Sequence, residues 1–159
     1  MSIAAIPQER WLQYKTNLKN QLNQIEIPVD ANPAVVRVIL SRIDKLFTDM
    51  RMEYAELEGH KDRVECLIRE IERVQAVGKN EIDRKRNAAL AVQNYAGTNG
   101  QVINLYDFQR QISERYSFLK GIIDSLYGKQ NRLITLNGML KLEQDTQPFS
   151  GQSRSPWEE

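Results

Sequence analysis

The longest regular pattern of apolar and polar positions runs from residue 34 to residue 95, without an internal proline. Apolar side chains recur every three or four residues, and the alternation typical of a β-strand is absent. Three apolar columns follow at heptad positions a, d and e: Val36, Ile43, Met50, Leu57, Val64 and Ile71; Ile39, Leu46, Leu67 and Val74; and Leu40, Phe47, Tyr54, Ile68 and Ile82. The pattern predicts one long central helix, which Gly59 and Gly78 bend without ending.

A shorter amphipathic pattern precedes it over residues 7–25, with Trp11, Leu18, Leu22 and Ile25 on one side. Residues 27–31 break this pattern. Asn32 is a good helix N-cap and Pro33 suits the first helical position, so we expect the long helix to begin there.

The pattern stops between Asn94 and Gly100, where two glycines and an Asn-Gly pair supply the positive φ angles that a reversal needs. We therefore expect a turn near residues 96–104. Residues 91–95 and 101–105 have a second possible arrangement, a short β-hairpin around Asn99-Gly100. A second long helix is expected over residues 105–143, with Asn104 as its cap and Asp107 in its first turn.

The second long helix carries a seven-residue repeat that indicates packing against a long partner. Its members are Leu105, Ile112, Leu119, Leu126, Leu133 and Leu140. The apolar stripes of both long helices are wider than one hairpin can cover. We therefore expect these residues to form core or oligomer contacts, the first helix to fold back as a third member, and the chain to form a homo-oligomer.

The expected fold class is all-α, an elongated helical hairpin or coiled coil built on a long central helix. Residues 1–31 form an N-terminal amphipathic helix and linker, and residues 32–145 form the hairpin with its turn near 96–104. Residues 146–159 are rich in Gln, Ser and Pro without apolar periodicity. We expect this tail to be disordered.

The charge balance gives no overall attraction to nucleic acid or membrane, because 22 Lys and Arg residues face 21 Asp and Glu residues. A single cysteine excludes an internal disulfide, and no secretory leader or run of eighteen apolar residues is present. These features predict a soluble, cytoplasmic protein with no membrane partner.

Catalytic patterns are missing from the sequence. It has no Gly-rich phosphate loop with lysine and no Gly-x-Ser-x-Gly, and His60 is its only histidine. We therefore expect no enzymatic activity, no cofactor and no metal site.

Cations and tyrosines gather where the two long helices should meet. Continuing the heptads places Lys85 at position a, and a reversal near residue 100 would set it opposite Arg115. Two buried cations need Glu81, Glu114 or an outside anion. Cations beside aromatic rings suit single-stranded nucleic acid. The candidate binding residues are Lys79, Arg84, Lys85, Arg86, Tyr95, Arg110 and Arg115.

Three motifs occur in a fixed order over residues 79–143: Arg84-Lys85-Arg86-Asn87-Ala88-Ala89-Leu90, Asn94-Tyr95-Ala96-Gly97-Thr98-Asn99-Gly100, and Ile122-Ile123-Asp124-Ser125-Leu126. This order resembles phage recombination-mediator proteins of the UvsY type. The resemblance implies a helical, ring-forming protein of the host cytoplasm. It would bind single-stranded DNA and load a recombinase onto strands covered by a single-strand-binding protein.

Within that resemblance, Arg84, Lys85 and Arg86 match the DNA-contacting helix of the family. Residues before 79 carry no motif of it. The alternative is a structural or adaptor coiled coil, such as a virion or assembly component, with protein partners only. In that case Glu81 and Glu114 neutralise Lys85 and Arg115.

Overall fold

The computed structural model describes residues 6–28, 32–97 and 100–146, with side chains as far as residue 143. The elements of this part of the chain are α1 (Gln8–Asn23), α2 (Pro33–Gln75), α3 (Glu81–Gln93), β1 (Tyr95–Ala96), β2 (Val102–Ile103) and α4 (Leu105–Thr146). The all-α class is confirmed. Thr146, expected in the disordered tail of residues 146–159, is the last residue of α4, and the rest of that tail lies outside the described residues.

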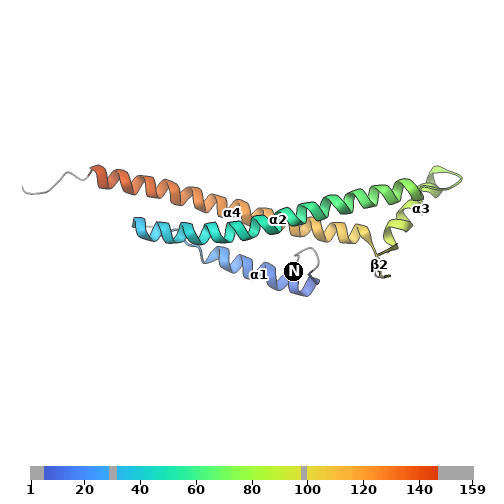
Figure 1. Ribbon diagram of the computed structural model, residues 1–159, viewed down its shortest axis with the longest axis horizontal. Coiled ribbons are helices and arrows are strands. Elements are labelled where there is room, and N and C mark those ends of the chain that lie inside the picture. The colour runs from blue at the N-terminus through green and yellow to red at the C-terminus, as the bar shows by residue number, and fades with distance from the viewer. Residues whose placement is uncertain (1–5, 29–31, 98–99, 147–159) are drawn as a thin grey trace, which may run out of the picture.

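Helices α2 and α4 lie antiparallel along an elongated rod (Figure 1). Three cross-helix pairs set their register: Gln130 Nε2 donates to Asp44 Oδ1 at 2.9 Å, the rings of Tyr54 and Tyr116 stack at 4.5 Å, and the Tyr106 hydroxyl donates to Glu72 Oε1 at 2.7 Å. Apolar side chains from both helices are buried between them: Val36, Ile43, Met50, Leu57, Val64, Ile68, Leu105, Ile112, Leu119, Leu126 and Leu133.

Leu140, the last member of the repeat, packs against this core while partly buried. The leucine repeat of α4 therefore forms core contacts within a single chain, as one part of the prediction stated. Its part in oligomer contacts stays a prediction.

Helix α1 lies beside the middle of the rod as a third helix (Figure 1). Trp11 is fully buried there, and its ring meets Phe118 edge-on at 5.5 Å. At the other end of α1, the Lys129 ammonium donates to the carbonyl oxygen of Ile25. The predicted third member is confirmed, and it covers the middle of the rod.

Both long helices begin where the capping residues predict. The Asn32 side chain accepts from the Val35 amide at 2.9 Å, ahead of Pro33. Asn104 Oδ1 accepts from the amides of Tyr106 and Asp107 at 3.1 and 3.4 Å. These bonds satisfy amides that a helix start otherwise leaves unpaired.

The prediction of one helix from residue 34 to residue 95 is wrong. Helix α2 ends at Gln75, and α3 is a separate helix packed against it. Helix α2 runs through Gly59 unbroken, whereas Gly78 lies in the break. A Cβ on Gly78 would lie 2.7 Å from the Asp83 Cβ and 3.0 Å from the Arg84 nitrogen. The close approach of the two segments therefore requires glycine.

Two asparagines hold the α2–α3 turn in place. Asn80 caps α3 by accepting from the Asp83 amide at 2.8 Å. Asn87 Nδ2 donates to the Val77 carbonyl oxygen at 2.6 Å. Each bond satisfies a main-chain group that the break would leave unpaired, so the turn has a defined geometry.

The segment expected to reverse the helices is a β-hairpin instead, the second of the two arrangements considered. Tyr95 pairs with Ile103 and Ala96 with Val102. Gly100 has a φ of 75°, the positive value that its place in the turn predicts. Residues 98–99 lie outside the described part. The chain therefore reverses at residues 76–80, and the hairpin leads from α3 into α4.

Candidate nucleic-acid interface

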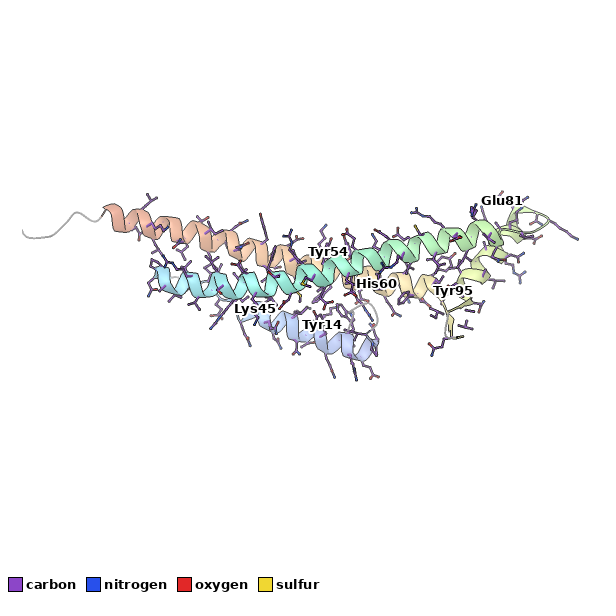
Figure 2. All side chains as sticks on the ribbon, in the orientation of Figure 1. Tyr14, Lys45, Tyr54, His60, Glu81 and Tyr95 are labelled. Carbon is purple, nitrogen blue, oxygen red and sulfur yellow. The ribbon has the colours of Figure 1, made fainter. Side chains whose placement is uncertain are left out.

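Helix α3 stands at the far end of the rod from the end of α4 (Figure 1). Figure 2 shows Glu81 at this end, with Tyr95 in the nearby hairpin. Only Ala88 and Val92 of α3 are buried, because the helix packs on the end of α2 through small side chains. Most of its surface is therefore available for contacts.

A groove of about 430 Å³ runs between α3 and the neighbouring ends of α2 and α4. Its lining is Glu72, Ala76, Glu81, Arg84, Lys85, Ala88, Ala89 and Tyr106. Three alanines leave room for a flat group. The side chains of Arg84, Lys85, Glu72 and Glu81 can form hydrogen bonds and ion pairs with a ligand in the groove.

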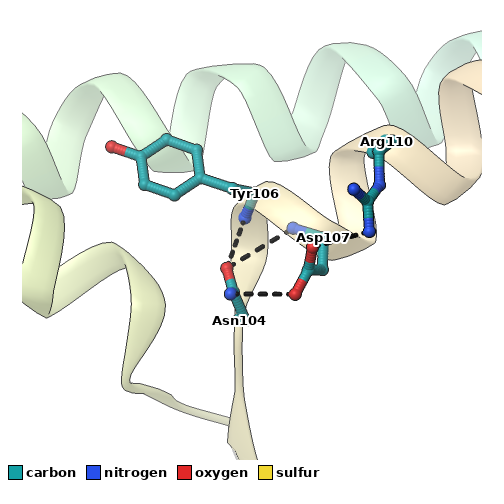
Figure 3. A network of polar contacts seen from close by, with 4 residues as sticks. All are labelled: Asn104, Tyr106, Asp107 and Arg110. Atoms are coloured by element: carbon teal, nitrogen blue, oxygen red, sulfur yellow. Dashed lines mark hydrogen bonds and ion pairs between the residues drawn. The ribbon is translucent and has the colours of Figure 1, made fainter.

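Tyr106 is fixed on the α4 side of the groove by the cap of that helix. Asn104 bonds the Tyr106 and Asp107 amides, and its own Nδ2 donates to the Asp107 carboxylate at 2.9 Å (Figure 3). The hydrogen bond to Glu72, with some burial, raises the pKa of the Tyr106 hydroxyl to about 12. The same hydrogen bond holds the ring of Tyr106 beside the end of α2.

Lys85 does not occupy a buried seam position, so that expectation is wrong. Its side chain is 77% exposed and pairs with Glu81 at 2.7 Å, one helical turn away. Since both partners are exposed, such a pair contributes at most about 1 kcal/mol. Within the described ranges, Lys79, Arg84 and Arg86 make no ion pair, and all three are exposed.

Tyr95, in strand β1 of the hairpin, and Arg110, in α4 just after the hairpin, differ in exposure. Tyr95 is partly buried against the core. Arg110 is exposed and bonds Asp107 at 3.0 Å (Figure 3). Arg110 is therefore accessible but partly neutralised, and Tyr95 offers only part of its ring.

Arg115 is the clearest correction to the predicted site. It is 2% exposed and lies under α1, where it donates to the Ile6 carbonyl oxygen at 2.9 Å. Its guanidinium lies 5.4 Å from the Trp11 ring centre. Burial lowers its pKa, and the charge of Glu114 opposes this effect. Arg115 therefore ties α1 to α4 and is not available to a strand.

The prediction that Lys85 lies opposite Arg115 is wrong, because it placed the reversal between the two long helices near residue 100. Tyr106 lies opposite Glu72, and Tyr116 opposite Tyr54. Helix α3 and the hairpin are inserted between these partners, so they shift α4 along α2. The two cations end up in different parts of the rod.

Glu72 and Tyr106 belong to the site although the candidate set omitted them. Their contact depends on the register, and no short motif marks it. A local signal did mark the turn: Gly78 followed by Asn80, with Glu81 and Asp83 after it, is a helix stop and a helix start.

In the described part of the chain, no helix has the length and apolar character needed to cross a membrane. Nor do His, Cys, Asp and Glu side chains gather there in a group that could hold a metal ion. The chain matches no family model, and the comparisons with curated proteins and with solved structures found no match either.

Proposed function

We propose that the protein binds single-stranded DNA in the groove beside α3. It acts as an oligomeric mediator that loads a recombinase onto strands covered by a single-strand-binding protein. It works without catalysis of its own, in the cytoplasm, which is the host's for a phage protein. One observation carries the proposal: exposed Arg84 and Lys85 line a groove with an alanine floor and a tyrosine wall.

The chemistry of a strand suits this groove. Phosphates take the place of the exposed Glu81 as partners of Lys85, at little cost since the exposed pair is weak. A base lies over Ala88 and Ala89 and stacks against Tyr106, as bases stack on aromatic platforms. The segment 79–86 carries four cations and two carboxylates, so its local charge attracts a polyanion.

The second candidate is an adaptor or assembly protein with protein partners only. The ion pair of Lys85 with Glu81 favours it, because that neutralisation is what the adaptor hypothesis predicts. The burial of Arg115 also removes one cation from the site. The two candidates differ in whether any strand binds.

The test is an anisotropy titration of a labelled single strand at two salt concentrations. Arg84→Ala with Lys85→Ala, which removes both cations that line the groove, should weaken binding at least tenfold, about 1.4 kcal/mol. The salt dependence should fall by about 0.7 per lost phosphate contact. Tyr106→Ala should cost a further 1–3 kcal/mol or so, and Tyr106→Phe much less, since stacking needs only the ring.

Arg10→Ala with Lys19→Ala is the matched control, because both cations are exposed on α1, away from the groove. Lys15 is less suitable, since it bonds Glu114 at 3.5 Å and lies over Phe118. Equal losses of strand affinity in the two double variants would mean that the strand is attracted by the general surface charge and not bound at the groove. If the unmodified protein does not bind the labelled strand, the result would favour the adaptor function.

A further inference from the structure

The outer face of α3, opposite the buried Ala88 and Val92, carries an apolar stripe with a cation in its middle. Ile82, Arg86 and Leu90 are spaced four apart, so they lie on one side of the helix. Ile82 is 78% exposed and Leu90 44%. Val77 is also exposed, in the turn that Asn87 holds against α3. These four residues, Val77, Ile82, Arg86 and Leu90, form the tip surface.

The tip surface is held rigidly, since Asn80 caps α3 and Gly78 allows the tight turn. Contiguous exposed apolar side chains rimmed by polar groups mark interaction sites. In the described part of the chain, Arg86 makes no ion pair. The surface therefore fits a partner that offers both an apolar ring and carboxylates.

We propose that the tip surface binds the segment Trp157-Glu158-Glu159 of a second copy of this chain. The indole fills the space between Ile82 and Leu90, with the Arg86 guanidinium over its face. The carboxylates of Glu158 and Glu159 neutralise Arg86 and the neighbouring Lys79. Tryptophan and arginine are both enriched among the residues that contribute most to binding at protein interfaces.

The length of the chain requires the segment to come from another copy. Trp157 follows the end of α4 at Thr146, so it reaches at most about 40 Å at about 3.6 Å per residue. Helix α4 has 42 residues and spans about 63 Å. The tip surface lies beyond the other end of α4, because Glu72 already faces Tyr106 and α2 continues to Gln75 (Figure 1). No chain can therefore occupy its own tip surface.

A contact between the tail of one copy and the tip of the next joins two unlike surfaces. Such a contact repeats until it closes into a ring or extends as a filament. It is separate from any pairing through the leucine repeat of α4. It also uses the outer face of α3, whereas the proposed strand groove uses the opposite side, so it does not depend on strand binding.

The test begins with the full chain carrying p-benzoylphenylalanine in place of Trp157. Isotopically light and heavy chains are mixed at low concentration, where they exchange, then concentrated and irradiated. Light-to-heavy cross-links from position 157 to residues 77–90 are expected. Cross-links within single chains, or cross-links to the groove of Ile27, Leu136 and Met139 at the opposite end of the rod, would overturn the proposal.

Sedimentation velocity over a range of concentrations supplies the second measurement. Trp157→Ala and Ile82→Asp should each weaken self-association at least about tenfold. Ile82→Asp spares the fold, because an aspartate in the first turn of α3 is favoured by the helix dipole. Met52→Asp is the matched control, since Met52 is 71% exposed on α2. Unchanged association in the first two variants would overturn the proposal.

Charge reversal separates a contact from a general loss of solubility. Arg86→Glu should weaken self-association, and adding Glu158→Arg with Glu159→Arg in the same chain should restore it. Failure of this rescue would overturn the ionic part of the contact. Since no DNA is present, these results are independent of whether the groove binds a strand.

Discussion

The middle of the rod and its α3 end are built on different principles. In the middle, three helices meet, and large side chains such as Trp11, Leu119 and Leu126 are fully buried. At the α3 end, a short helix is attached through Ala88 and Val92, and its position depends on Gly78 and the capping Asn80. Stability is therefore concentrated in the middle, and accessible chemistry at the end.

The largest expected effect tests the middle directly. Leu126→Asp should destabilise the fold by more than about 5 kcal/mol, because it removes core packing and buries an unpaired carboxylate. Thermal unfolding followed by circular dichroism measures this loss. Tyr127→Asp, at the exposed neighbouring position, should have little effect. Similar melting temperatures for the two variants would remove the distinction between buried and exposed sites.

Trp11→Ala should give the next largest loss, about 3–5 kcal/mol, because a fully buried indole leaves a cavity. It should also loosen α1, which Trp11 holds against Phe118. Urea denaturation gives the free energy of unfolding. Leu12→Ala is the control, since Leu12 is exposed on the same helix. A loss below about 1 kcal/mol for Trp11→Ala would show that α1 adds little to the middle.

Gly78→Ala tests the α3 end. The added methyl group would meet Asp83 and Arg84, so we expect a local cost of about 1–3 kcal/mol. Hydrogen exchange should quicken at the amides of α3 and stay unchanged in the middle of the rod. Gly121→Ala, with open space around it in α4, should stabilise by about 0.5–1 kcal/mol. Faster exchange along the whole rod would show that the two regions unfold together.

The smallest effect is a loss of stability at high pH. Burial, with the nearby charge of Glu53, raises the pKa of Tyr14 to about 12, and the hydrogen bond between the Tyr54 and Tyr116 hydroxyls does the same for Tyr116. A raised folded pKa means that this stability is complete below pH 10 and is lost as pH rises toward 12.

The midpoint of urea unfolding, measured from pH 9 to 12, should therefore fall, and Tyr14→Phe should reduce the fall. Tyr127→Phe is the control, because Tyr127 is exposed. An unchanged pH profile in Tyr14→Phe would show that this hydroxyl is not linked to folding.

The sequence predicted the middle well because its signals there are local and repeated. The heptads of Val36, Ile43 and Leu126 mark buried faces, and Asn32 marks the start of α2. Each of these signals depends on neighbours within a turn or two of helix. Long-range contacts did not have to be known.

The α3 end was harder to predict, since its structure depends on which segments meet. The apolar pattern continues from Val74 to Ile82, so the heptads alone do not show the break. Gly78 is needed only because Asp83 approaches it, and this approach is a tertiary contact. Because α3 folds back on α2, the register of α4 against α2 differs from the predicted one. Arg115 therefore lies in the core and not in the predicted site. The prediction that the cations of α3 lie close together does not depend on this register, because Arg84, Lys85 and Arg86 are neighbours in sequence.

The register of α2 against α4 has a consequence for how chains of this architecture can change length. The pairs Asp44 with Gln130 and Tyr54 with Tyr116 lie where α2 and α4 run side by side, whereas residues 76–97 and 100–104 lie beyond that paired stretch. Insertions in the rod must come in matched whole heptads, or every buried side chain turns away from its partner. Insertions between residues 76 and 104 carry no such restriction. In chains of this architecture, the paired part of α2 and α4 should therefore change length only in whole heptads. The end that carries α3 can be lengthened, shortened or exchanged.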